Sequence, residues 1–180
     1  MSRVVLSGVQ SSGKSTILEI IKPSLGATVV YEEIVRTLIK QGVKINREAD
    51  HKSQCIILEQ HYKNTLINEE FISDRGAIDA FVYGTWSYLN GDFTYKEHKE
   101  QEEIFLSCLP MYTHHYYLPI EFEAVADDVR DTNEEYRHQL EYIYLTTYHK
   151  YNIPYVELKG SVETREAIFW DDLLRNTVQK

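Results

Sequence analysis

Residues 8–15 read Gly8-Val9-Gln10-Ser11-Ser12-Gly13-Lys14-Ser15, a G-x-x-x-x-G-K-S pattern typical of a loop that binds the phosphates of a nucleoside triphosphate. The apolar run Val4-Val5-Leu6 comes before the loop, and Thr16-Ile17-Leu18 continues after it as a helix. The glycines let successive backbone N–H groups turn toward one anion, and the new helix adds the positive end of its dipole. The strand, loop and helix therefore predict a nucleoside triphosphate site.

The last residues of this loop have distinct chemical roles. Lys14 reaches the β- and γ-phosphates, and the hydroxyl of Ser15 is a ligand for Mg²⁺. We expect Lys14 to lie at an exposed helix start, where its replacement costs little packing. The alternative, a plain glycine-rich turn, leaves the Lys-Ser pair after the second glycine unexplained. The expected donor-binding residues of the loop are Gly8, Gln10, Ser11, Ser12, Gly13, Lys14, Ser15 and Thr16.

Length and composition limit the class of protein. The chain has 180 residues, of which 43% are hydrophobic and 26% charged, so we expect one domain over 1–180 with its own core. The net charge of −9 argues against broad binding to nucleic acid. Cys55 and Cys108 lie far apart and predict neither a disulfide framework nor a zinc site. The sequence predicts no membrane-spanning segment and no signal peptide, and cytoplasmic localisation is the expectation.

Five short apolar runs alternate with longer helical patterns, which is typical of an α/β fold with a parallel sheet covered on both faces. The expected strands are Arg3–Ser7, Thr28–Tyr31, Phe71–Ser73, His115–Leu118 and Tyr155–Leu158. The expected helices are Gly13–Ile21, Glu32–Lys40, Arg47–Asn68, Ala77–Leu89, Tyr95–Cys108, Asn133–Tyr151 and Val162–Val178.

Helix boundary signals support several of these elements. Capping boxes are predicted at Thr94 and Thr132, and left-handed helix ends at Gly42 and Gly91. Two stripes with a four-residue period are expected to be buried: Leu58, Tyr62 and Leu66, and Leu140, Tyr144 and Tyr148.

The apolar run Phe71-Ile72-Ser73 ends in Asp74, at the carboxyl end of a parallel strand beside the phosphate loop. A carboxylate there can hold Mg²⁺ directly or through water, and capping of the next helix is the alternative role. The order Asp74-Arg75, with Asp79 and Tyr83 on the following helix, resembles the P-loop nucleoside and nucleotide kinases. Thymidylate kinase-like domains share Asp-Arg and the tyrosine but carry Ser where this chain has Asp79, and Asp-Arg-Gly-x-x-Asp is closer to nicotinamide riboside kinase-like domains.

This resemblance implies a three-layer α/β/α P-loop kinase fold with a five-stranded parallel sheet in the order 2-3-1-4-5. Glu33-Ile34-Val35-Arg36 is similar to a Glu-x-x-Arg pattern in these kinases and would face the acceptor. A carboxylate there can take a proton from a sugar hydroxyl, and an arginine can hold a phosphate. A shift of one residue would give the role of Glu33 to Glu32, and both could instead simply favour the helix N-terminus. The expected acceptor-binding residues are Glu32, Glu33, Arg36, Arg75, Asp79 and Tyr83.

The segment near 121–137 resembles the lid of these kinases, in which arginines neutralise the transferring phosphoryl group. Arg130 is the better match and Arg137 the second candidate, while a solvated loop is the alternative. Ser161 and Val162 stand where the resemblance places the adenine-contacting loop, although an ordinary turn would also explain them.

The predicted function is ATP- and Mg²⁺-dependent transfer of the γ-phosphoryl group to a small nucleotide-type acceptor. The preferred acceptor is a deoxynucleoside monophosphate, because two arginines, Arg36 and Arg75, suit a phosphate. A nucleoside or nicotinamide riboside is the alternative acceptor, which Glu33 favours. A nucleotide-dependent ATPase switch and a kinase acting on a hydroxyl within DNA or RNA are further alternatives. The sequence leaves open whether the chain forms a homodimer.

Overall fold

The computed structural model describes residues 2–32, 34–123 and 133–178. The strands are β1 (Arg3–Ser7), β2 (Val29–Tyr31), β3 (Phe71–Asp74), β4 (His114–Tyr117) and β5 (Val156–Glu157). The α-helices are α1 (Lys14–Ile21), α2 (Ile34–Lys40), α3 (His51–Ile67), α4 (Ala77–Leu89), α5 (Tyr95–Cys108), α6 (Glu134–Lys150) and α7 (Val162–Val178). Short 3₁₀ turns lie at Lys22–Ser24, Asn46–Glu48 and Leu109–Met111.

The five strands form one parallel sheet in the order β2-β3-β1-β4-β5, as the family resemblance implies. β1 pairs with β3 on one side and with β4 on the other, so the strand order reverses at β1. In open α/β sheets, ligands bind at such a switch point, outside the carboxyl ends of the strands. The phosphate loop leaves the sheet at that point.

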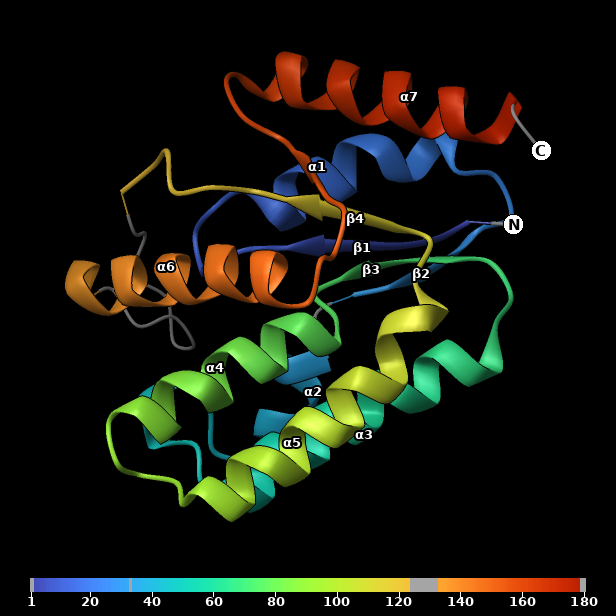
Figure 1. Cartoon of the computed structure of the whole chain (residues 1–180). Helices are drawn as coiled ribbons and strands as arrows, with labels where there is room; N and C mark the ends of the chain where they lie inside the picture. The colour runs from blue at the N-terminus through green and yellow to red at the C-terminus, as the bar shows by residue number, and fades with distance from the viewer. Residues whose placement is uncertain (1, 33, 124–132, 179–180) are drawn as a thin grey trace.

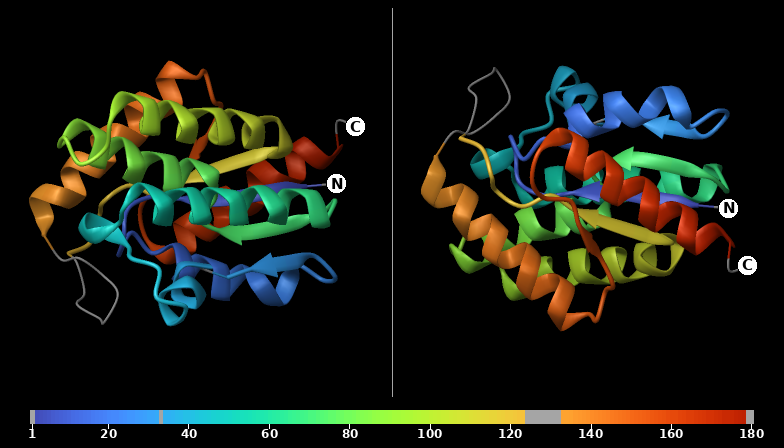
Figure 2. Two further views of the ribbon diagram at one scale, coloured as in Figure 1. Left: turned by 90° about the horizontal axis from the view of Figure 1, so that it is seen from below. Right: turned by 90° about the horizontal axis from the view of Figure 1, so that it is seen from above.

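Helices cover both faces of the sheet, which gives the expected three layers (Figure 1). α1 and α7 lie on one face, and α3, α4, α5 and α6 lie on the other (Figures 1 and 2). Each side has its own apolar core: Leu6 and Phe169 belong to the first, and Phe105 and Tyr144 to the second. Burial of these side chains fixes the helices against the sheet and holds the strand ends in place.

Several helix boundaries follow the sequence signals. The backbone N–H of Glu97 donates to the side chain of Thr94, and the Glu97 carboxylate accepts the Thr94 N–H, which confirms this capping box. Gly42 and Gly91 adopt φ of 84° and 83°, as left-handed helix ends require. The stripe of Leu140, Tyr144 and Tyr148 is buried as predicted.

Other boundaries differ from the expectation. α3 begins at His51 instead of Arg47, because Asp50 caps it by accepting the Ser53 N–H at 2.8 Å. The cap of α6 is Asn133, which accepts the Tyr136 N–H at 2.8 Å, and not Thr132, which lies outside the described residues.

The buried stripe predicted on α3 is wrong at its last position. Leu58 is buried, but Leu66 is 58% exposed. Leu66 lies in the last turn of α3, which ends at Ile67, and Ile67 is also exposed (70%), so this end of the helix projects into solvent. None of the helices in the described part of the chain combines the length and apolarity that a bilayer-spanning segment requires.

Candidate functional site

The phosphate loop joins the end of β1 to the start of α1, and its two glycines are required by the geometry. Gly8 has φ 145°, and a Cβ placed there would lie 2.4 Å from the carbonyl oxygen of Leu118. Gly13 has φ 92° and is the N-cap of α1. Side chains at these positions would be strained or would collide with backbone, so the loop can close only with glycine.

Lys14 lies inside the loop. Its ammonium donates to the carbonyls of Gly8 at 2.8 Å and Val9 at 2.6 Å, and to the hydroxyl of Ser12 at 3.3 Å. The residue is only 5% exposed, so the expectation of an exposed lysine is wrong. The loop curls around the side chain because its carbonyls satisfy the ammonium donors.

Ser15 and Asp74 bring two oxygen donors together beside the loop. The hydroxyl of Ser15 donates to Oδ2 of Asp74 at 2.7 Å. The described residues contain no group of three or more His, Cys, Asp or Glu side chains arranged to hold a metal. Mg²⁺ in phosphotransfer sites takes few protein ligands and completes its shell with waters and substrate phosphates. A hydroxyl and a carboxylate at the carboxyl end of β3 fit such a site.

Arg75 follows β3 in an unusual backbone conformation, with φ 76°. Its guanidinium Nη1 donates to the carbonyl of Gly8 at 3.1 Å and pairs with Asp79 at 3.4 Å. Its Cζ lies 5.6 Å from the centroid of the Tyr83 ring. A positive φ in a residue other than glycine costs free energy, so these surrounding contacts must hold Arg75 at the junction of strand and loop.

Asp79, on α4, is buried and is connected by hydrogen bonds to β1 and α6. Its carboxylate accepts hydrogen bonds from the Ser7 hydroxyl at 2.9 Å, the Gly76 N–H at 2.9 Å and the Tyr144 hydroxyl at 2.7 Å. The residue is 2% exposed and faces Arg75. This network ties the start of the phosphate loop to the helix that follows β3.

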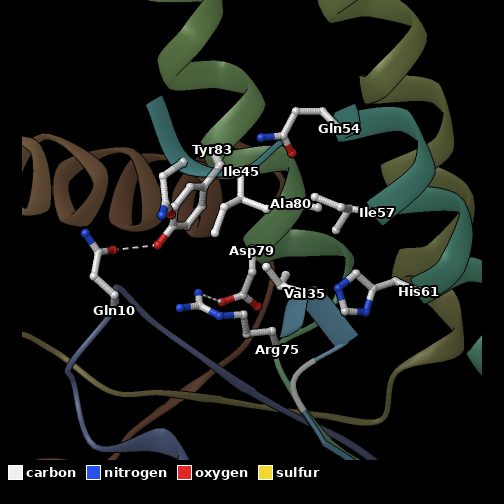
Figure 3. Close-up of a pocket in the computed structure, with 11 residues that line it drawn as sticks. Gln10, Val35, Ile45, Gln54, Ile57, His61, Arg75, Asp79, Ala80 and Tyr83 are labelled. Carbon is white, nitrogen blue, oxygen red and sulfur yellow. Dashed lines mark hydrogen bonds and ion pairs between the residues drawn. The ribbon is translucent and has the colours of Figure 1, made fainter. Parts of the chain in front are cut away.

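A second pocket lies beside the phosphate loop, on the side of α3 and α4 (Figure 3). Gln10 and Arg75 line both this pocket and the one around the loop. Tyr83 donates its hydroxyl proton to Oε1 of Gln10 at 2.6 Å, which links the two pockets.

The walls of the second pocket are apolar, with a few polar groups. Val35, Ile45, Ile57 and Ala80 supply apolar surface from four separate parts of the chain. Gln54 and His61 supply polar atoms from α3, and both are buried.

Both polar groups from α3 are suited to recognising a ligand. Oε1 of Gln54 has no hydrogen-bond partner among the described residues. Burial lowers the pKa of His61 to about 4, although the charge of Asp79 acts in the opposite direction, so the ring is neutral at pH 7. A buried polar atom without a partner is costly unless a ligand satisfies it.

A family model described as an AAA domain matches residues 3–165. The chain belongs to this family. No curated protein matches the sequence. Among solved structures, the AAA domain is similar to a deoxyadenosine kinase from M. mycoides with the products dCMP and dCDP bound. The two are 19% identical, with coverage of 97% of this chain and 98% of that chain and a TM-score of 0.72.

A structure of the NadR protein in complex with NR is also similar, at 18% identity and a TM-score of 0.67. The match covers 89% of this chain and 44% of that one. At these identities the similarity establishes the fold, which the AAA domain shares with these P-loop kinases.

The structure places the sequence-predicted residues of this AAA domain in three groups. The loop residues, Asp74, Arg75, Asp79 and Tyr83 lie together around the two pockets. Glu32 is exposed and pairs with Lys22 at 2.9 Å. Glu33 and Arg130 lie outside the described residues, and Arg36 belongs to α2.

Of the described residues expected in the lid and the adenine-contacting loop, only some line the pocket around the phosphate loop. Val162 lines the pocket around the phosphate loop, whereas the Ser161 hydroxyl contacts Thr164 at 3.1 Å. Arg137 is fully buried, and its guanidinium donates to Glu134 and to the Phe122 carbonyl. It is not among the described residues that line either pocket.

Four residues that line the pockets of this AAA domain were not predicted from the sequence as site residues: Gln54, His61, Phe122 and Arg165. A signal for two of them exists on α3. Gln54 and His61 share one helix face with the buried Ile57, and polar residues on an apolar face either satisfy one another or bind a ligand. No comparable signal identifies Phe122 or Arg165.

Proposed function

We propose that this AAA domain is an ATP-dependent kinase that transfers a phosphoryl group to a hydroxyl of a nucleoside or nicotinamide riboside. The junction between the two pockets carries the proposal. The pocket around the phosphate loop and the second pocket share Gln10 and Arg75, so ligands in the two pockets would meet at these residues. Phosphoryl transfer needs this arrangement because its catalysis consists mostly of positioning and charge stabilisation.

The chemistry of the second pocket favours an acceptor that carries no phosphate. Arg75 is the one cationic side chain among the described residues that line this pocket, and it faces the carboxylate of Asp79. Val35, Ile45 and Ala80 offer apolar surface to a base, while Gln54 and His61 offer neutral hydrogen-bonding atoms to a base or carboxamide. A nucleoside or nicotinamide riboside can contact these groups without placing a phosphate of its own beside Asp79.

Each residue of the junction has a role in this reaction. Lys14 and the loop N–H groups hold the donor phosphates, and Ser15 and Asp74 would hold Mg²⁺, which neutralises charge on the phosphates. The acceptor oxygen forms a bond to the γ-phosphorus while the bond from that phosphorus to the β–γ bridging oxygen of ATP breaks, which releases ADP. Glu33 takes the proton that the acceptor hydroxyl loses, and Arg130 closes over the transferring group.

A nucleoside monophosphate is the second candidate acceptor. Arg36 belongs to α2 and Arg75 follows β3, two of the segments that border the pocket, and two arginines suit a phosphate ester. The apolar walls of the pocket and the pairing of Arg75 with Asp79 lead us to place the nucleoside first and the monophosphate second. We also take dATP or dCTP as alternative donors to test, since solved deoxyadenosine kinase structures contain them.

The proposal is tested by offering ATP with each nucleoside, with nicotinamide riboside and with each matching 5′-monophosphate. ADP release and mass spectrometry of the product identify the acceptor. We expect nucleosides or nicotinamide riboside to be converted to monophosphates. Preferential conversion of monophosphates would support the second candidate, and ATP hydrolysis without any acceptor would point to an ATPase switch.

A matched pair of variants tests the proton acceptor. Glu33→Gln should lower kcat by about 100-fold or more, within the range of general base catalysis. Glu32→Gln should have a much smaller effect, because Glu32 is exposed and bound to Lys22. The reverse result would assign the base to Glu32, and equal small effects would remove a general base from the mechanism.

A further inference from the structure

Arg165, near the start of α7, is almost completely buried against the phosphate loop, with 1% of its surface exposed. Its Nη1 donates to the carbonyl of Ser12 at 2.7 Å, its Nε to the carbonyl of Gly160 at 3.0 Å, and its Nη2 to the carboxylate of Glu121 at 2.5 Å. One guanidinium therefore joins the phosphate loop to two segments that follow β4 and β5.

The Glu121 side of this network holds the arginine in place. Glu121 also accepts the N–H of Gly160 at 2.8 Å. Burial would raise the pKa of Glu121, but the hydrogen bonds from Arg165 and Gly160 hold it below its ordinary value, so the carboxylate is ionised at neutral pH. The centroid of the Phe122 ring lies 4.9 Å from Cζ of Arg165, so the aromatic ring packs against the guanidinium.

The contact with Ser12 has a consequence for phosphate binding. In a trans peptide unit the C=O and N–H groups point in opposite directions. The carbonyl of Ser12 points toward Arg165 on α7, so the N–H of Gly13 in the same peptide points away from α7. Gly13 is also the N-cap of α1, where N–H groups bind anions.

We infer that Arg165 is a positioning residue for the donor: it orients the Ser12–Gly13 peptide so that its N–H is directed at the phosphates. A cation on the carbonyl also polarises the peptide and strengthens its N–H as a donor. The close fit supports this role, because a Cβ on Gly13 would lie 2.9 Å from Nη1 of Arg165. The inference rests on the proposed use of a nucleoside triphosphate by this loop.

The test measures binding of ATP and of inorganic tripolyphosphate to the full chain, without an acceptor. Arg165→Met should weaken both by about 10-fold or more, the size expected for loss of a charge-assisted hydrogen bond. Arg165→Lys keeps the charge but loses the planar fork, and should give an intermediate loss. Arg175→Met is the matched control, since it removes an exposed arginine of the same helix that pairs with Asp171, and it should stay within about 3-fold of wild type.

The double variant Arg165→Met with Glu121→Gln covers the case in which an unpaired Glu121 prevents folding. It should bind tripolyphosphate as weakly as Arg165→Met while the acceptor KM stays near that of wild type. Unchanged ATP and tripolyphosphate binding in any folded Arg165 variant would overturn the inference. So would a parallel loss of donor affinity, acceptor affinity and thermal stability, which would indicate a structural role alone.

The wild-type measurement separates this inference from the proposed function. Wild-type protein that binds tripolyphosphate but phosphorylates no acceptor would contradict the proposed reaction, and loss of that binding in the Arg165 variants would still support the positioning role. Wild-type protein that binds neither ATP nor tripolyphosphate would overturn both.

Discussion

The phosphate loop and the second pocket (the proposed acceptor pocket) lie next to each other and share two residues, but they are built in different ways. The loop consists of consecutive residues between β1 and α1, and residues 10–17 supply more than half of the residues that line its pocket. The acceptor pocket takes side chains from α2, the 3₁₀ turn before α3, α3 and α4. A site made of one short segment is readable as a motif, whereas a site made of four segments depends on how they pack.

The two regions also differ in how the hydrogen-bonding groups of their buried side chains are paired. In the phosphate loop, the ammonium of Lys14 has three hydrogen-bond partners within the protein. In the acceptor pocket, Gln54 carries a buried oxygen without a partner among the described residues. The donor side is therefore held by the protein itself, and the acceptor side contains the groups that a ligand would satisfy.

The largest expected effect comes from removing the lysine of the phosphate loop. Lys14→Met should lower kcat by about 100-fold or more, because the lysine neutralises charge that develops on the phosphates. ADP release at saturating ATP and acceptor measures it, with Lys22→Met on the surface as a control for charge loss. Because Lys14 is buried, thermal unfolding must be recorded in parallel. Near wild-type turnover would contradict the role of this loop as the donor site.

A pH experiment tests the burial of His61. Its pKa is about 4 in the folded protein and about 6.5 when unfolded. The unfolded state binds the proton first as pH falls, so stability is lost between about pH 6.5 and 4. His61→Gln should therefore reduce the change in unfolding free energy between pH 7 and 4.5 by about 2–3 kcal/mol.

His115 provides the matched comparison for this experiment. Burial lowers its pKa to about 4 as well, yet it does not line the acceptor pocket. His115→Gln should change the acid dependence of unfolding in the same direction without altering acceptor KM, whereas His61→Gln should change both. Equal effects of the two variants on KM would contradict a role for His61 in acceptor recognition.

Gln54→Leu sharpens the contrast between the two pockets. Loss of one hydrogen bond to the acceptor should raise its KM by about 10-fold. The ATP KM should be nearly unchanged, because Gln54 does not line the pocket around the loop. Steady-state kinetics with each substrate varied in turn separates the two values. An increase in ATP KM alone would place the donor, and not the acceptor, against α3.

Tyr83→Phe has the smallest expected effect and tests the link between the pockets. Removing the hydrogen bond from its hydroxyl to Gln10 should lower kcat by about 5-fold or less, since both ligands still bind. Single-turnover measurements with both substrates saturating report this step. A loss of two orders of magnitude would mean that Tyr83 contacts the reacting atoms.

Much of the fold could be predicted from the sequence, because the signals for it are local. The bounds of α4, α5 and α7 agree with the expectation, since each has clear boundary residues such as Thr94 and Gly91. The resemblance to P-loop kinases supplied the strand order, which periodicity alone does not contain. Boundaries moved where a neighbouring side chain competed for the cap, as Asp50 and Asn133 do.

The sequence by itself determined the phosphate loop and the position of Asp74, because backbone conformation and a strand end are set by residues close in the chain. Only the tertiary structure decided that Lys14 is buried, that Asp79 joins three elements, and that Arg165 reaches Ser12. These contacts depend on the distance between side chains that packing brings together from remote segments. No local pattern encodes such a distance, since it follows from how the helices bury their apolar faces against the sheet.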